Sequence, residues 1–173
     1  MAIIIPGTNA TIKSNIAEKQ LFHAFQLLHL AELNVTYNPQ KKDNIQSSFN
    51  DNTFTFNGNF TLPCTQELIN GQPLLVATNY LETNYPFNAG SPAGTFKSIS
   101  LPAYLLDVIT YCQILENDLN VNPSGKNYIN ASFNSDRNVF SGSITMPYET
   151  TMDQETGNKS ISISPYLEHS ATL

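Results

Sequence analysis

The prediction of the fold starts from the stretch Asn38-Pro39-Gln40-Lys41-Lys42-Asp43-Asn44-Ile45-Gln46-Ser47-Ser48-Phe49-Asn50, because the chain contains a second, similar stretch. The second stretch is Asn122-Pro123-Ser124-Gly125-Lys126-Asn127-Tyr128-Ile129-Asn130-Ala131-Ser132-Phe133-Asn134, 84 positions later. Without a gap, residues 38–63 align with residues 122–147, and 11 of the 26 positions are identical. Coincidence in a chain rich in Asn, Ser and Thr is the alternative, but the apolar pattern repeats together with the polar residues. We therefore predict a tandem duplication.

Each repeat is predicted to contain one long helix followed by an antiparallel meander of three strands. Repeat one spans residues 1–84, with a helix at about 15–34 and strands at about 45–49, 53–62 and 74–81. Repeat two spans residues 85–173, with a helix at about 102–119 and strands at about 128–133, 138–146 and 160–167. Ser100 is the expected cap of this helix, and Pro102 lies in its first turn, where a missing N–H costs nothing. A short lead strand before each helix, at Thr11–Lys13 and Thr95–Lys97, completes a βαβββ unit. The predicted fold class is α+β, with two such units related by a pseudo-twofold axis and forming one globular domain.

The middle strand of each repeat has the clearest period of two. In repeat one the apolar face consists of Phe54, Phe56, Gly58, Phe60 and Leu62. In repeat two it consists of Phe140, Gly142, Ile144 and Met146. Glycine on such a face permits the close approach of another segment, so we expect the helix of each repeat to cross the sheet over Gly58 and Gly142. A tight hairpin turn at Asn57-Gly58 is the alternative, but it would leave very short strand arms.

Prolines are expected to end both middle strands. Pro63 and Pro147 occupy equivalent positions immediately after the alternating stretches. Proline lacks the N–H that a central ladder needs, which makes it unfavourable inside a sheet. Cys64 would then lie just beyond a strand.

Both helices are apolar over most of their circumference, so each must be covered on more than one side. We expect the helix of the other repeat to provide part of this cover, giving a helix pair between sheets. The remaining apolar surface would face a partner subunit or an apolar ligand. The candidate wall residues for such an interface or ligand are Phe22, Phe25, Tyr104 and Tyr111.

The outward faces of the predicted strands carry neutral polar residues, as in Thr55, Asn57, Asn59 and Thr61. Solvent-facing strands commonly carry Lys and Glu, which discourage pairing with other chains. The pattern is compatible with a surface held against another subunit, and equally with the overall Asn, Ser and Thr bias of the chain. Arg137, the single arginine, has no charged counterpart in repeat one and is a candidate contact at the rim of an interface.

No arrangement of residues points to catalysis, a cofactor or a metal. His23 and His29 are six positions apart, so they point to different sides of a helix, whereas metal chelation needs a spacing of three or four. Two cysteines, Cys64 and Cys112, cannot make a disulfide framework. We find no phosphate-binding glycine loop and no serine-elbow motif. We therefore predict no catalytic, cofactor-binding or metal-binding residues.

Composition excludes some partners and favours others. A formal net charge of −6 and a single arginine argue against nucleic-acid binding, which needs clustered basic residues. No apolar run is long enough for a transmembrane helix, and no signal peptide is recognisable at the N-terminus. We therefore expect synthesis in the cytoplasm, with the final location open and a virion or secreted assembly among the options.

Three classes of function remain. The first is a non-enzymatic structural protein, a subunit of a homo-oligomer or of a larger virion-like or tail-like complex. A fused pair of similar units suits closed rings, because two quasi-equivalent edges per chain halve the number of chains needed. The second class is a binding module for an apolar small molecule held between helices and sheet. The third is an enzyme of unknown class.

Overall fold

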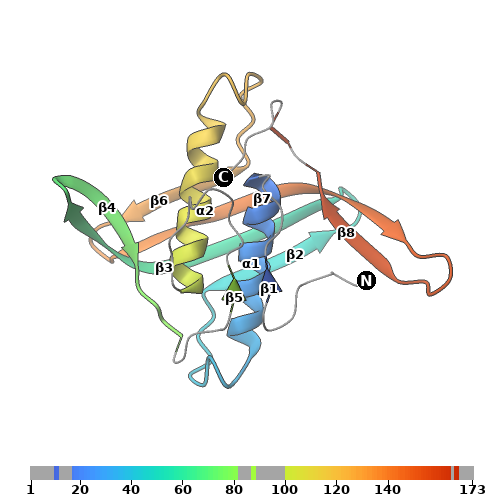
Figure 1. The fold of residues 1–173 in the computed structure, drawn as a ribbon, viewed down its shortest axis with the longest axis horizontal. Coiled ribbons are helices and arrows are strands. Elements are labelled where there is room, and N and C mark those ends of the chain that lie inside the picture. The colour runs from blue at the N-terminus through green and yellow to red at the C-terminus, as the bar shows by residue number, and fades with distance from the viewer. Residues whose placement is uncertain (1–9, 12–16, 82–86, 89–99, 165, 168–173) are drawn as a thin grey trace.

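The chain folds into one six-stranded antiparallel sheet with two helices across one face. The computed structural model describes residues 10–11, 17–81, 87–88, 100–164 and 166–167. The elements are β1 (Ala10–Thr11), α1 (Ala17–Leu33), β2 (Ile45–Asn50), β3 (Thr55–Ile69), β4 (Gln72–Ala77), β5 (Phe87–Asn88), α2 (Leu101–Glu116), β6 (Ile129–Asn134), β7 (Val139–Met152) and β8 (Lys159–Ile163). The α+β class is as predicted. We expected the helix pair to lie between two sheets, and this expectation is wrong. The helices lie side by side across the strands of one sheet (Figure 1).

The sheet is built around β3 and β7, which pair with each other in the order β2-β3-β7-β6. The expected three-strand meander is therefore wrong in one respect, since the third strand does not flank the middle strand on its far side. The N–H of Thr61 donates to Asn44 and the carbonyl of Pro63 accepts from Thr78, so β2 and β4 lie end to end along the same edge of β3. In the same way, β6 and β8 follow one another along β7. The other edge of β3 pairs with β7.

Both middle strands continue through the prolines that we expected to end them. β3 has 15 residues and β7 has 14. Pro63 lies beside the junction between the start of β2 at Ile45 and the end of β4 at Ala77, so its missing N–H falls in a gap between ladder partners. Its carbonyl still accepts a hydrogen bond from Thr78 at 2.8 Å, and that of Pro147 accepts one from Ser164 at 3.0 Å. Beyond its proline, each long strand continues and pairs with a further strand: β3 with β4 and β7 with β8.

The central pairing has a twofold pattern. Asn59 and Ser143, which are 84 positions apart, pair directly in the β3–β7 ladder. Cys64 donates its N–H to Asn138, and Tyr148, 84 positions after Cys64, donates its N–H to Phe54. These two backbone hydrogen bonds therefore join equivalent positions of the two halves, with donor and acceptor halves exchanged.

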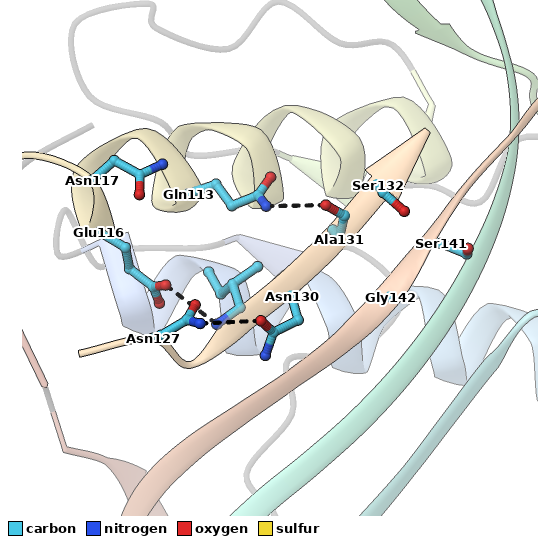
Figure 2. A pocket seen from close by; sticks show the side chains of 10 residues that line it. Gln113, Glu116, Asn117, Asn127, Asn130, Ala131, Ser132, Ser141 and Gly142 are labelled. Atoms are coloured by element: carbon cyan, nitrogen blue, oxygen red, sulfur yellow. Dashed lines mark hydrogen bonds between the residues drawn. The ribbon is translucent and has the colours of Figure 1, made fainter. Parts of the chain in front are cut away.

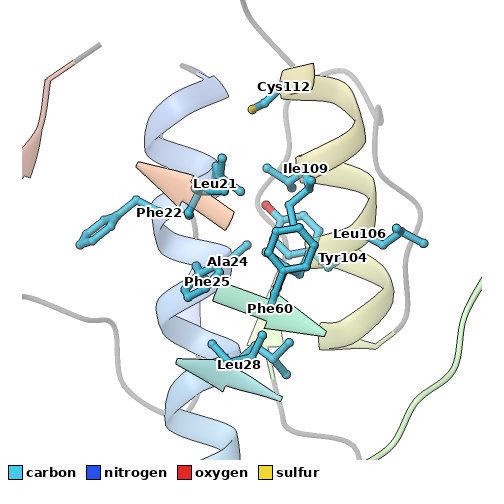
Figure 3. Packing of buried hydrophobic residues seen from close by; sticks show 14 of the residues in the cluster. Leu21, Phe22, Ala24, Phe25, Leu28, Phe60, Tyr104, Leu106, Ile109 and Cys112 are labelled. Atoms are coloured by element: carbon cyan, nitrogen blue, oxygen red, sulfur yellow. The ribbon is translucent and has the colours of Figure 1, made fainter. Parts of the chain in front are cut away.

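The core fills the space between the helix pair and the sheet (Figure 3). Phe22 and Phe25 from α1 meet Phe56 of β3 edge to face, with ring centroids 5.1 and 5.7 Å apart. From α2, the side chain of Tyr104 is fully buried. As predicted, Ser100 caps α2: its hydroxyl accepts from the N–H of Ala103, and Pro102 lies in the first turn of the helix. In the described part of the chain, neither helix has the length and apolar character needed to cross a bilayer.

The two glycines on the apolar sheet face have different neighbours. A Cβ atom on Gly58 would lie 2.5 Å from the ring of Phe25, so α1 does approach the sheet there, as expected. A Cβ atom on Gly142 would lie 2.0 Å from the carbonyl oxygen of Asn130 in the adjacent strand β6. The helix-crossing explanation for Gly142 is therefore wrong, because the close neighbour is strand backbone.

The structure describes only part of the expected lead strands. β1 is Ala10–Thr11, and it pairs in parallel with β5, Phe87–Asn88. Most of the expected lead strand at Thr11–Lys13, and all of the one at Thr95–Lys97, lies outside the described residues.

Candidate functional site

A buried carboxylate near the end of α1 ties the helix to the start of β2. Glu32 accepts hydrogen bonds from the backbone N–H groups of Asn44 and Ile45, each at 3.1 Å, and from the hydroxyl of Tyr80. The side chain of Asn38 bridges the carbonyls of Glu32 and Lys42 at 2.9 and 2.7 Å. The Lys42 ammonium donates to the carbonyl of Tyr80 at 3.2 Å. We call Glu32, Asn38, Lys42 and Tyr80 the Glu32 clasp.

The same arrangement occurs at the end of α2. Glu116 accepts from the N–H groups of Tyr128 and Ile129 and from the hydroxyl of Tyr166. Asn122 and Lys126 make the bonds that their counterparts make in the first clasp. We call Glu116, Asn122, Lys126 and Tyr166 the Glu116 clasp. Each clasp connects a helix, the loop after it, the next strand and the segment after the third strand, so it holds these four parts of the fold together.

Burial sets the protonation chemistry of both clasps. It raises the pKa of Glu32 above its ordinary value of 4.5, against the opposing effect of the hydrogen bonds from Tyr80 and the backbone. Burial also raises the pKa of Glu116, again against its hydrogen bonds. Burial and the adjacent carboxylate raise the pKa values of Tyr80 and Tyr166, so each tyrosine stays protonated and donates.

These raised carboxyl pKa values predict a pH dependence of stability. Protons bind more tightly to the folded chain, so this stabilising contribution is complete below the ordinary pKa of 4.5 and is lost as the pH rises through the raised values. As the pH rises from the ordinary value of 4.5 toward neutrality, the free energy of unfolding should fall. The variant carrying both Glu32→Gln and Glu116→Gln should show a flatter profile. Urea denaturation across this range measures both, and parallel profiles would contradict the prediction.

A polar pocket of about 560 Å³ lies between α2 and β6 (Figure 2). Its lining residues are Gln113, Glu116, Asn117, Asn127, Ile129, Asn130, Ala131, Ser132, Ser141 and Gly142. Gln113 donates across it to the carbonyl of Ala131 at 3.3 Å, and Asn127 donates to Asn130 at 3.2 Å. The single ionisable lining residue, Glu116, already belongs to a clasp. The pocket therefore offers neutral hydrogen-bonding groups and no acid–base pair.

A second pocket, of about 350 Å³, lies beside the Glu32 clasp. We call it the α1-end pocket, and it is lined by His29, Glu32, Leu33, Val35, Asn38, Lys41, Lys42, Asp43 and Ile45. Leu33 and Val35 are 68% and 66% exposed. The pocket therefore combines an exposed apolar wall with a charged rim.

The aromatic residues singled out in the sequence lie in the core. Phe22, Phe25 and Tyr104 are buried and packed against other protein side chains, and Tyr111 is half-buried. Arg137 is exposed in the turn between β6 and β7, where its N–H donates to the side chain of Asn134. None of the five lines either pocket described above.

The histidines and cysteines of the described chain form no reactive cluster. No group of three or more His, Cys, Asp or Glu side chains in the described residues is arranged to hold a metal ion. Burial lowers the pKa of His23 and raises the pKa values of Cys64 and Cys112, and both cysteines are free thiols. A raised thiol pKa disfavours the reactive thiolate.

Two hairpins extend beyond the central strands, one at each end of the sheet (Figure 1). The first arm, Cys64–Ala77, is the β3–β4 hairpin, and its side chains of Leu68, Ile69 and Leu74 are 78%, 42% and 47% exposed. The second arm, residues 148–163, is the β7–β8 hairpin. Asp51, in the turn before β3, accepts a hydrogen bond from Tyr148 and lies 4.0 Å from the ammonium of Lys159. Only the second arm has these ties to the β2–β3 turn.

The first arm was not predicted from the sequence, although it contains a recognisable signal. Asn70-Gly71 connects β3 to β4, with positive φ angles of 53° and 78° at the two residues. An Asn-Gly pair between extended stretches is the strongest short-range signal for a hairpin. Because we expected the strand to end at Pro63, Asn70-Gly71 was not recognised as the turn of a hairpin.

The sheet face opposite the helices is uncharged in its four central strands. Its side chains alternate with buried ones in β2, β3, β6 and β7. The polar ones are Gln46, Ser48, Asn50, Thr55, Asn57, Asn59, Thr61, Asn130, Ser132, Asn134, Ser141, Ser143 and Thr145, and the same face also carries Pro63, Val139 and Pro147. The hydroxyl of Thr145 donates to Asn57 across the β3–β7 pair at 3.2 Å. Neither helix covers this face.

Comparisons of the chain with protein-family models, with curated proteins and with solved structures find no match.

Proposed function

We propose that this protein is a non-enzymatic structural subunit that assembles with further copies of itself. The observation that carries the proposal is the first arm, whose long aliphatic side chains are exposed on both faces. Leu68 lies on one face of the hairpin, and Ile69 and Leu74 lie on the other. A two-stranded hairpin is at best marginally stable in water, so an apolar arm of this kind is favoured by a covering partner.

The uncharged sheet face supports the same proposal. It presents hydroxyl and amide groups in rows, such as Gln46, Asn59, Ser143 and Asn130, which are neighbours across the four strands. Docking against such a surface requires no charged group to be desolvated, and polar side chains can exchange water for hydrogen bonds to a neighbour.

A tandem duplication would explain why the subunit has two similar halves. The twin clasps and the self-pairing of Asn59 with Ser143 support it, because two halves descended from one ancestor would meet on a twofold axis. A subunit of this kind presents two quasi-equivalent edges, which suits closed rings and shells.

The test is the oligomeric state of the purified chain, measured by light scattering over a wide concentration range. The wild type should form a discrete oligomer, and the variant with Leu68→Ser and Leu74→Ser should shift to monomer. Leu68 and Leu74 are 78% and 47% exposed and lie outside the core, so thermal unfolding of the variant should begin near the wild-type temperature.

Leu119→Ser is the matched control, since Leu119 is 76% exposed but lies after α2, outside the arm. It should assemble as the wild type does. A wild type that stays monomeric at every concentration, or an arm variant that assembles normally, would overturn the proposal.

A further inference from the structure

We propose that the first arm of one copy docks into the α1-end pocket of another copy, with Leu74 entering the pocket and Glu67 pairing with Lys41. The inference rests on the proposed self-assembly and names the contact that produces it. It describes a head-to-tail interface, because the arm and the pocket are different parts of the surface.

The arm presents the two groups on one face. Glu67 of β3 lies directly opposite Leu74 of β4, so their side chains project from the same side of the hairpin. Ile69 lies on that side as well, two positions along the strand. Leu74 and Ile69 are 47% and 42% exposed, and Glu67 is exposed. We call Glu67, Ile69 and Leu74 the Glu67 face.

The pocket matches this face in size and in chemistry. Its volume of about 350 Å³ is small for a ligand site and suits one or two aliphatic side chains. Leu33 and Val35 form an exposed apolar wall, whose burial against Leu74 and Ile69 would remove aliphatic surface from water on both partners.

The charges are complementary. Glu67 is the one charged residue between Cys64 and Ala77. On the rim of the pocket, the charges of Lys42 and Asp43 offset each other, and Glu32 is buried in its clasp. The ammonium group of Lys41 therefore makes the net charge of the exposed rim positive. Lys41 is exposed, and among the described residues no acidic side chain forms an ion pair with it. This pocket would favour the binding of a carboxylate next to an apolar side chain.

The second arm does not offer the same match. Its corresponding face carries Glu149, Thr151, Ser160 and Ser162, with no aliphatic side chain beside the carboxylate. The pocket beside the Glu116 clasp is also different, because Asn117 and Asn127 stand where the α1-end pocket has Leu33 and Asp43. One arm and one pocket are therefore suited to each other.

Charge reversal on the full chain tests the contact by sedimentation velocity at several protein concentrations. Glu67→Lys and Lys41→Glu should each weaken self-association about tenfold or more, because each brings like charges together. The variant with both changes should return to within about threefold of the wild type. An equimolar mixture of the two single variants should also assemble. Leu74→Ser should weaken association, whereas Glu155→Lys, the same charge change at the tip of the second arm, should not.

The outcomes separate the two proposals. A wild type that is monomeric at all concentrations would overturn both the contact and the assembly function. Assembly that persists unchanged in Glu67→Lys, or single defects that the double variant does not repair, would overturn this contact alone. All four positions are exposed, so circular dichroism should show the same fold in every variant.

Discussion

Glu32→Ala is expected to lower the free energy of unfolding by about 3 kcal/mol or more, since each buried donor left without an acceptor costs roughly 1–3 kcal/mol. The substitution removes the acceptor of two backbone N–H groups and of the Tyr80 hydroxyl. Ile45 is fully buried and Tyr80 is 7% exposed, so water cannot readily replace the carboxylate. Urea denaturation at pH 7 measures the loss.

Glu32→Gln is the control that separates shape from charge. Its amide oxygen can accept from Asn44 and Ile45, and its amino group can donate to the Tyr80 hydroxyl oxygen. The cost should therefore stay within about 1 kcal/mol. Glu116→Ala and Glu116→Gln should repeat this contrast in the second clasp. Equal losses for the alanine and glutamine variants would show that the hydrogen bonds of the clasp are not what stabilises the fold.

Gly142→Ala is expected to cost about 3 kcal/mol or more, at or above the upper end for overpacking a filled site. The new methyl group would meet the carbonyl oxygen of Asn130 at 2.0 Å and the Cα atom of Ala131 at 2.7 Å. These are backbone atoms of β6 in the β6–β7 ladder, so relief requires the edge strand to move. Thermal denaturation measures the effect, and hydrogen exchange should show loss of protection confined first to β6.

Two further glycine variants calibrate this expectation. Gly58→Ala should cost less than Gly142→Ala, because its close neighbour is the ring of Phe25, and Phe25→Leu in the same chain should restore part of the loss. Gly71→Ala has no neighbour within 4 Å but has a φ of +78°, so it should cost only the roughly 1–2 kcal/mol of a left-handed residue. Similar losses at Gly142 and Gly71 would contradict the proposed steric cause.

Local patterns predicted the helices and the inward faces of the strands. The helix at about 102–119 corresponds to α2, and its Ser100 cap and early proline are where the sequence placed them. The alternation correctly assigned Phe56, Phe60 and Leu62 to the core. Phe54, expected on the same face, lies instead in the turn before β3 with a φ of 53° and is 48% exposed, so that part of the prediction is wrong. These features depend on neighbours in the chain, through capping and periodicity, so a sequence contains them directly.

The candidate site was predicted only in part. The neutral outer faces were visible in the alternation of residues, but the first arm was not, because the rule that proline ends a strand was applied to Pro63. That rule depends on what lies beside the strand. In this fold the proline falls at the junction between β2 and β4, where no partner needs its N–H, and the strand continues into the arm.

The two helices, the alternating strands and the similar segments at Asn38 and Asn122 could be recognised from the chain alone, since each depends on residues close together in the chain. The pairing of β3 with β7, the strand backbone beside Gly142 and the contact of Glu32 with Tyr80 across 48 positions became known only from the folded structure. Such contacts arise from how whole elements pack together, and burial then makes the hydrogen bonds of the clasps costly to lose.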